Sequence, residues 1–304
     1  MTTATQVDAA GGVFSGDESG GGRWSEAFRR LRRNPVAILG AVLVLLFVLV
    51  AIFAPWLAPH DPQEQLLLGE VRPGFVPGPR EGFPLGVDSL GRDELSRLLY
   101  GSRQSLLVGI VSTLLGLSLG LLLGGLAGAF GGRVDNVLMR VTDLMLSIPG
   151  LLTAITITVI LGPSLTSVMI AIAIVNVPIF ARLLRGSMLA QRDADYVLAA
   201  RSIGLRRRTI VLSHIVPNSL GPVIVQATLT LATSIIDAAA LSFLGLGNQD
   251  GTPEWGQMLA EAQDLLGTRA ALAFYPCIAI VIAALGFTLL GEALREALDP
   301  KFRR

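Results

Sequence analysis

The sequence predicts an all-α integral membrane protein with six transmembrane helices. Of its 304 residues, 52% are hydrophobic and only 15% are charged, a balance too apolar for an ordinary soluble domain. Several apolar runs are about 20 residues long, which is the length that a helix needs to cross the roughly 30 Å hydrocarbon core of a bilayer. The net charge of +1 lacks the bulk basic character that a nucleic-acid partner would favour.

The N-terminal segment before the first apolar run divides into two parts. Residues 1–22 are rich in Gly, Thr, Ser and Ala and lack the charged start of a signal peptide, so we expect a disordered cytoplasmic tail. Residues 23–35 place Trp24, Phe28 and Leu31 at helical spacing among arginines. This pattern is typical of an amphipathic interfacial helix, and equally of the positive flank of a first span.

The remaining chain is expected to contain the spans. Residues 36–104 hold the first span, over 36–56, and a Pro-rich extracytoplasmic loop with a short amphipathic helix around 92–100. Residues 105–298 form the core, and 299–304 a cytoplasmic tail. Spans 2 to 6 of the core are expected over 106–130, 134–161, 164–184, 220–246 and 271–294.

Two of these spans carry helix-shaping residues. Span 2 repeats glycine at every fourth position, a pattern that lets helix backbones approach closely in lipid and predicts a packing seam. These glycines are Gly116, Gly120, Gly124 and Gly128. Span 3 contains Pro149 followed by Gly150, which should kink it.

The distribution of basic residues predicts the orientation. Six spans place both termini on one side. If the N-terminus is inside, the inner segments carry 18 of the 24 Lys and Arg residues. The positive-inside rule therefore predicts N-in and C-in, with the segment 184–218 in the cytoplasm.

Segment 184–218 is a polar loop between two spans, with a regular internal pattern. Tyr196, Ala199 and Ala200 lie on one face of a short helix, and Gly204 permits a sharp break. A second short helix is expected to follow, ended by a proline. It carries Arg206, Arg207, Arg208, His214 and Pro217. A structured polar loop on one face of a membrane protein predicts a docking surface.

Lysine usage argues against nucleotide hydrolysis by this chain. Lys301 is the only lysine, whereas a Walker A loop needs a lysine between its glycines and a Ser or Thr. One cysteine and two distant histidines also make no metal site. We expect a chain that is not an enzyme and binds no cofactor or metal itself.

Five segments carry a resemblance to a known family. Leu198-Ala199-Ala200, Gly204 and Pro217 match the spacing of the EAA loop of permease subunits in bacterial ABC importers, except that Leu198 stands where the family has Glu. The segments PLGVDSLGRDELSRLLYGSRQSL, DLMLSIPGLL, ALSFLGLGNQDGTPEWGQML and LREALDP resemble the second, C-type permease subunit of dipeptide, oligopeptide and nickel importers. The similarity spans roughly residues 30–300.

The resemblance implies a type I ABC importer permease fold in the bacterial cell membrane. It implies that the loop couples to one or two ABC ATPase subunits, or to a fused ATPase, which carry ATP and Mg. A second, homologous permease would complete a heterodimer within membrane lipid, and an extracytoplasmic binding protein would deliver di- or oligopeptides. Nickel or another small solute is an alternative cargo. An ion-coupled secondary transporter and an intramembrane enzyme are alternative mechanisms.

Some polar residues have both functional and structural interpretations. Asp237, Asn176, Asp143 and Ser147 lie in spans, where polar groups line a pathway or join helices. For Asp143 we favour a structural role, and for Asn176 a hydrogen bond between helices. For Asp237 both the functional and the structural interpretation stay open. Glu254 and Trp255, in the outer loop, are candidates for contact with the binding protein or for an interfacial anchor.

Overall fold

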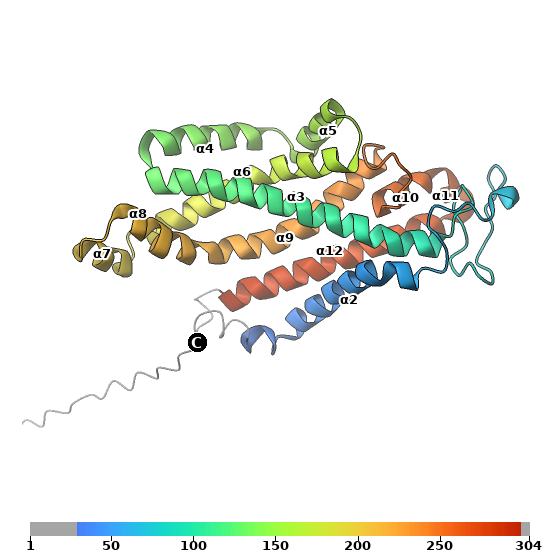
Figure 1. The fold of residues 1–304 in the computed structure, drawn as a ribbon, viewed down its shortest axis with the longest axis horizontal. Helices are drawn as coiled ribbons and strands as arrows, with labels where there is room; N and C mark the ends of the chain where they lie inside the picture. Colours follow the sequence, from blue (N-terminus) through green and yellow to red (C-terminus); the bar gives the residue numbers. More distant parts are fainter. Residues whose placement is uncertain (1–28, 299–304) are drawn as a thin grey trace, which may run out of the picture.

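The computed structural model describes residues 29–298, and this part of the chain is a bundle of long helices without a β-sheet. The expected tail 1–22, residues 23–28 of the expected helix 23–35 and the tail 299–304 lie outside the described residues. Five helices are long and apolar enough to span a membrane, or six with one bent pair. They run side by side in Figure 1. The five are α2 (Pro35–Leu57), α3 (Glu94–Phe130), α6 (Leu165–Gln191), α9 (Val216–Phe243, preceded by a helical start from Arg207) and α12 (Ala271–Leu298).

The third expected span is broken, which corrects the prediction of a kink. Helices α4 (Gly132–Ser147) and α5 (Gly150–Leu161) meet at 91°. Ile148 has extended backbone because it precedes Pro149, and the α region is disfavoured before proline. Pro149 also lacks the N–H that a continuous helix would need.

Three other boundaries differ from the prediction. The helix expected around 92–100 and the second span are one continuous helix, α3, in which Gly101 lies directly against Trp255. Pro217 does not end a helix. It sits in the first turn of α9, where a missing N–H costs little, directly after the π-helical turn η2 (Val211–Ile215). Helix α6 also runs seven residues beyond the expected end at 184.

The glycine stripe of α3 packs against α6. An added Cβ on Gly116 would lie 2.8 Å from the carbonyl oxygen of Ala173, and one on Gly120 would lie 2.8 Å from that of Val177. Gly124 meets the backbone of Ala181 in the same way, whereas Gly128 lies against the side chain of Met188. Because glycine has no side chain, the backbones of α3 and α6 come into direct contact here, as expected for a seam of small residues.

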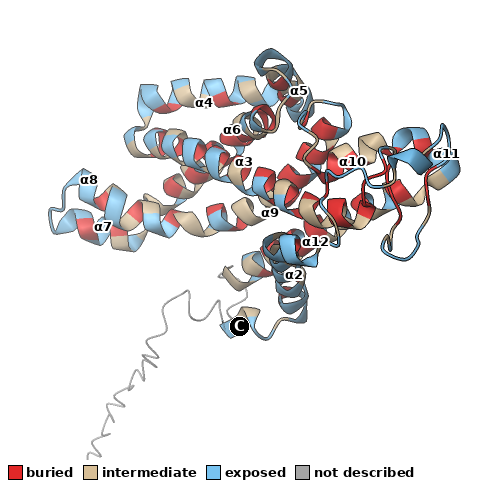
Figure 2. Ribbon diagram, turned by 45° about the vertical axis from the view of Figure 1, so that its right-hand side comes forward, coloured by how far each residue is buried: buried red, intermediate tan, exposed pale blue. Residues whose placement is uncertain are grey.

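The two ends of the bundle are distinct. Asn34 Nδ2 donates to Glu296 Oε2 at 3.2 Å, so the start of α2 meets the end of α12. Figure 1 shows α7 (Asp195–Ser202) and α8 (Arg207–Ile210) projecting at this same end, whereas α10 (Trp255–Glu261), α11 (Leu266–Arg269) and the 58–93 loop lie at the other. Buried residues concentrate where α3, α6, α9 and α10 pack together, and α2 is largely exposed (Figure 2).

Candidate functional site

The loop between α6 and α9 consists of two short helices at a fixed angle. Helix α7 (Asp195–Ser202) ends where the N–H of Gly204 bonds to the carbonyl of Arg201 at 3.0 Å and that of Leu205 to the carbonyl of Ala200 at 3.1 Å. This pair of bonds is a Schellman motif, which requires a left-handed residue after the helix. Gly204 has φ +80°, and helix α8 (Arg207–Ile210) follows.

The inner face of the loop is attached to the bundle. Val197 and Ala200 of α7 are buried together with Ile210 and Ile215 against α6. The α6 side chains in this cluster are Phe180, Leu184 and Met188. Tyr196 adds a polar tie, since its hydroxyl donates to Gln191 Oε1 at 2.7 Å. The loop is therefore packed as one unit with the ends of α6 and α9.

The outer face of the loop exposes apolar side chains. Ile203 is 77% exposed and Leu198 is 46% exposed. Ala199 lies on this face too, whereas Ala200 is buried. Large exposed hydrophobic groups on a polar loop mark a surface that another protein can cover.

The three loop arginines have different environments. Arg207 Nη2 donates to the carbonyls of Ala129 at 2.6 Å and Phe130 at 3.1 Å, at the C-terminus of α3. These carbonyls have no partner within their own helix, and the cation also complements the negative end of the helix dipole. Arg206 and Arg208 are exposed, as Arg207 is. Of the other candidates, His214 is half-buried in η2 and Pro217 is exposed.

Asn176 joins three helices inside the bundle. Its Nδ2 donates to Ser234 Oγ at 3.1 Å, and Thr113 Oγ1 donates to the same oxygen at 3.3 Å. All three side chains are buried, on α6, α9 and α3 respectively. Asp237 follows Ser234 by one turn of α9 and is half-buried.

The acidic residues of α4 pair with arginines of α6. Asp143 Oδ1 accepts from Arg182 Nη2 at 2.6 Å, and both side chains are 53% exposed. Asp135 accepts two bonds from Arg185, each at 2.7 Å. Sequence reasoning missed Arg182, Arg185 and Asp135, because nothing local indicates that residues about 40 to 50 positions apart meet. Ser147 bonds within its own helix, to the carbonyl of Leu144.

Glu254 and Trp255 are both 1% exposed, so the surface open to an outer docking protein is formed by other residues. Trp255 Nε1 donates to the carbonyl of Leu98 at 3.0 Å, and its ring meets that of Phe47 edge-on at 5.5 Å. The Glu254 carboxylate accepts from the N–H of Gly256 and caps α10. Burial raises the pKa of Glu254.

A buried ion network holds the outer end together. Arg97 is fully buried and pairs with Asp88 at 3.2 Å and Glu261 at 2.8 Å. Arg92 pairs with the same two carboxylates, at 2.6 and 2.7 Å. Carboxylates in a polar outer loop are expected at the surface, yet Asp88, Asp93 and Glu94 are all buried. Glu261 comes from a segment more than 160 residues away from Arg97, so the sequence does not reveal this network.

Two family models match the chain. The model described as "Binding-protein-dependent transport system inner membrane component" matches residues 120–304. The model described as "N-terminal TM domain of oligopeptide transport permease C" matches residues 22–70. Together they cover both the core and the N-terminal helix.

Similar curated proteins match over nearly their whole length. The dipeptide transport system permease protein DppC of Alkalihalophilus pseudofirmus is 43% identical over 281 residues, which are 92% of this chain and 90% of that protein. The di/tripeptide transport system permease protein DppC of Pseudomonas aeruginosa is 44% identical, over 91% of this chain and 92% of that protein. The glutathione transport system permease protein GsiD of Escherichia coli is 44% identical, over 92% and 91% respectively.

A solved structure has the same fold in the core. A chain of the MetNI methionine ABC transporter in an inward facing conformation superposes with a TM-score of 0.56 at 21% identity. The match covers 67% of this chain and 97% of that one.

Proposed function

The chain belongs to the family of inner-membrane components of binding-protein-dependent transport systems, and from this premise we propose that it forms half of the translocation pathway of an ATP-driven importer of short peptides. It is a multi-pass protein of the inner membrane with the fold of a type I ABC importer permease. The proposed cargo rests on relatives named as dipeptide, di/tripeptide and glutathione permeases at 43–44% identity.

Coupling to an ATPase is supported by the loop of α7 and α8, which has one face packed on the bundle and one face exposed. Its inner face is packed against α6, and its outer face presents Leu198 and Ile203 at one end of the bundle. An ATPase subunit that covers this outer face could push or pull the loop as a rigid lever. Movement of ATPases toward each other would then switch the permease between inward-facing and outward-facing states.

Leu198 suggests how the ATPase is held. The family pattern has Glu at this position, and here the side chain is an exposed leucine. The docking contact would therefore contain apolar burial where relatives use a carboxylate. ATP and Mg would bind only on the ATPase partners, because this chain lacks the Walker lysine.

A second, homologous permease would complete the pathway as a heterodimer. Helices α4 and α5 supply an apolar face that is exposed in the single chain. Val137, Leu144, Ile148, Leu152 and Ile160 belong to it. Asp143 and Arg182, half exposed at the side of this face, would lie near the junction with the partner.

Reconstitution tests the proposal. The chain would be placed in liposomes with its neighbouring permease, its ATPases and its binding protein, and uptake of a labelled dipeptide would be followed. We expect uptake that requires ATP, the ATPases and the binding protein together. Uptake by this chain alone, driven by an ion gradient, would overturn the proposal in favour of a secondary transporter.

A further inference from the structure

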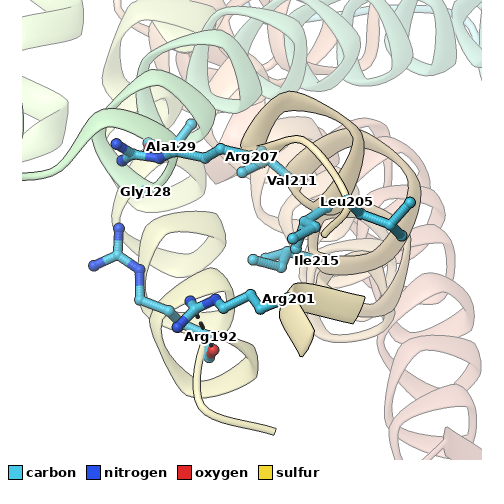
Figure 3. A pocket seen from close by; sticks show the side chains of 9 residues that line it. Gly128, Ala129, Arg192, Arg201, Leu205, Arg207, Val211 and Ile215 are labelled. Atoms are coloured by element: carbon cyan, nitrogen blue, oxygen red, sulfur yellow. Dashed lines mark hydrogen bonds between the residues drawn. The ribbon is translucent and has the colours of Figure 1, made fainter. Parts of the chain in front are cut away.

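A pocket of about 380 Å³ lies between the loop that contains α7 and α8, called the coupling loop below, and the ends of α3 and α6. Three arginines line it: Arg192 at the end of α6, Arg201 in α7 and Arg207 in α8. Figure 3 shows their guanidinium groups gathered on one side of the pocket, with Val211 and Ile215 on the other. The residues that line the pocket include no Asp or Glu.

The pocket is suited to an anion. Each guanidinium has five N–H donors in a planar fork, and such forks match the geometry of phosphate oxygens. Arg201 and Arg207 each use Nη2 on backbone carbonyls. Like charges gathered without a lining carboxylate repel each other, and a bound anion would relieve this repulsion. The nearby Asp193 and Asp195 are exposed and do not line the pocket.

An apolar groove continues from the pocket. Its volume is about 590 Å³, and it shares Ala129, Arg207 and Val211 with the pocket. Leucines of α3 form one wall, and Val211, Val216 and Leu220 form the other. The α3 wall extends from Leu121 to Phe130, which is about 13 Å at ~1.5 Å per residue. One leaflet of the hydrocarbon core is about 15 Å thick.

We propose that the pocket and the groove together bind one anionic phospholipid of the inner leaflet. The phosphate lies among Arg192, Arg201 and Arg207, and an acyl chain lies in the groove between α3 and α9. The occupant must have a negative head beside an apolar tail, because the cationic pocket opens onto an apolar channel of leaflet depth. Such a lipid joins α3, α6, α7 and α8, and so ties the coupling loop to the transmembrane helices. The proposal does not depend on which solute is transported.

Native mass spectrometry of the purified, delipidated transporter complex tests the proposal. Phosphatidylglycerol and phosphatidylcholine of equal chain length would be titrated separately into the wild type, an Arg192→Gln/Arg201→Gln variant and an Arg206→Gln control. The Arg206→Gln substitution removes the same kind of charge from the same loop, but Arg206 lines neither cavity. We expect a preference for phosphatidylglycerol in the wild type and the control, and roughly 20- to 30-fold weaker phosphatidylglycerol binding in the double variant. Arg207 is left intact because it also caps α3.

A second variant tests the groove. Gly125 lines it, and an added Cβ would lie 3.7 Å from Leu184 Cδ2, which is ordinary contact. Gly125→Phe should fill the groove and weaken the binding of both lipids without removing the arginines. Unchanged phosphatidylglycerol binding in either the double variant or Gly125→Phe overturns the proposal.

Two further results would identify a different occupant. If inorganic phosphate displaces phosphatidylglycerol at equal concentration, the site takes a free anion and the acyl chain contributes nothing. If the double variant loses ATPase subunits from the complex while it binds phosphatidylglycerol as the wild type does, the arginines dock a protein. Either result overturns the lipid assignment.

Discussion

Arg207 Nη2 lies 2.6 Å from the carbonyl oxygen of Ala129, so the first residue of α8 caps the last turn of α3. This contact connects the coupling loop to the longest helix of the core across 78 positions of sequence. A charge that the positive-inside rule places in the cytoplasm thus also fixes the loop to the core. Arg206, next to it in the sequence, is exposed like Arg207 and provides a comparison.

Replacing Arg207 should loosen the end of α3. In Arg207→Ala the carbonyls of Ala129 and Phe130 lose a charged donor, at a cost of about 1 kcal/mol. We expect faster amide hydrogen exchange around residues 127–131, and less transport for each ATP hydrolysed. Arg206→Ala is the control and should leave exchange there unchanged. Equal exchange in both variants would mean that the Arg207 contact contributes nothing.

Gly204 should be required for the angle between α7 and α8. At φ +80° an L side chain costs roughly 1–2 kcal/mol, although an added Cβ has open space around it. Gly204→Leu should therefore uncouple ATPase activity from peptide uptake while membrane insertion stays normal. Gly186→Leu is a matched control, because Gly186 also has open space but lies within α6 without positive φ. Normal uptake by Gly204→Leu would count against the lever.

Substitutions at glycines of α3 should differ in effect according to whether the glycine lies in the seam with α6. A Cβ on Gly120 would lie 2.8 Å from the carbonyl oxygen of Val177, whereas one on Gly125 makes only ordinary contact. Gly120→Ala should destabilise the protein by about 1–3 kcal/mol, because the helices must separate. Thermal unfolding in detergent would measure the loss, with Gly125→Ala as the tolerated control. A seam that tolerates both substitutions equally would not be in backbone contact.

Arg97 should be essential for the outer end of the bundle. Removing it leaves Asp88 and Glu261 in a largely buried site with one cation fewer, and broken buried pairs cost about 3–5 kcal/mol. We expect Arg97→Leu to lower the unfolding temperature strongly and to expose residues 58–93 to protease. Glu70→Gln breaks the exposed pair with Arg80 and should change neither measurement. Protease resistance in Arg97→Leu would show that the network is dispensable.

Stability should depend on pH through Glu254. Burial raises the pKa of this carboxyl above its ordinary value of 4.5, so the folded state binds the proton more tightly than the unfolded state. Stability is then highest at low pH, and it falls as pH rises from the ordinary value towards the folded value. Glu254→Gln keeps an acceptor for the Gly256 N–H and should flatten this part of the curve. The measurement is the unfolding temperature between about pH 5 and 8, and an identical slope in wild type and variant would exclude Glu254 as the cause.

The fold class was predictable because the bilayer limits the choices. Backbone groups in lipid must bond within their own segment, so apolar runs of about 20 residues become helices. The spans at 36–56 and 271–294 correspond to α2 and α12, and the five motifs pointed to the family that the comparisons show. The seam of α3 was visible because its glycines repeat at a helical period.

The site was predictable only in part. Gly204 was visible as the break between two short helices, since local turn chemistry requires glycine there. The burial of Trp255 was not visible, because Phe47, Leu98 and Gly101 surround it from other helices. The 91° break before Gly150 was underestimated, since a proline alone is compatible with anything from a gentle kink to a right angle.

The sequence by itself determined the membrane class, the apolar segments, the side on which the arginines gather and the family. These properties depend on composition, period and local motifs. Only the tertiary structure decided which charges pair, as with Arg97 and Glu261 or Arg207 and the end of α3. Such pairs form because packing brings together groups far apart in the chain, and a buried or helix-terminal charge is stable only beside the partner that packing supplies.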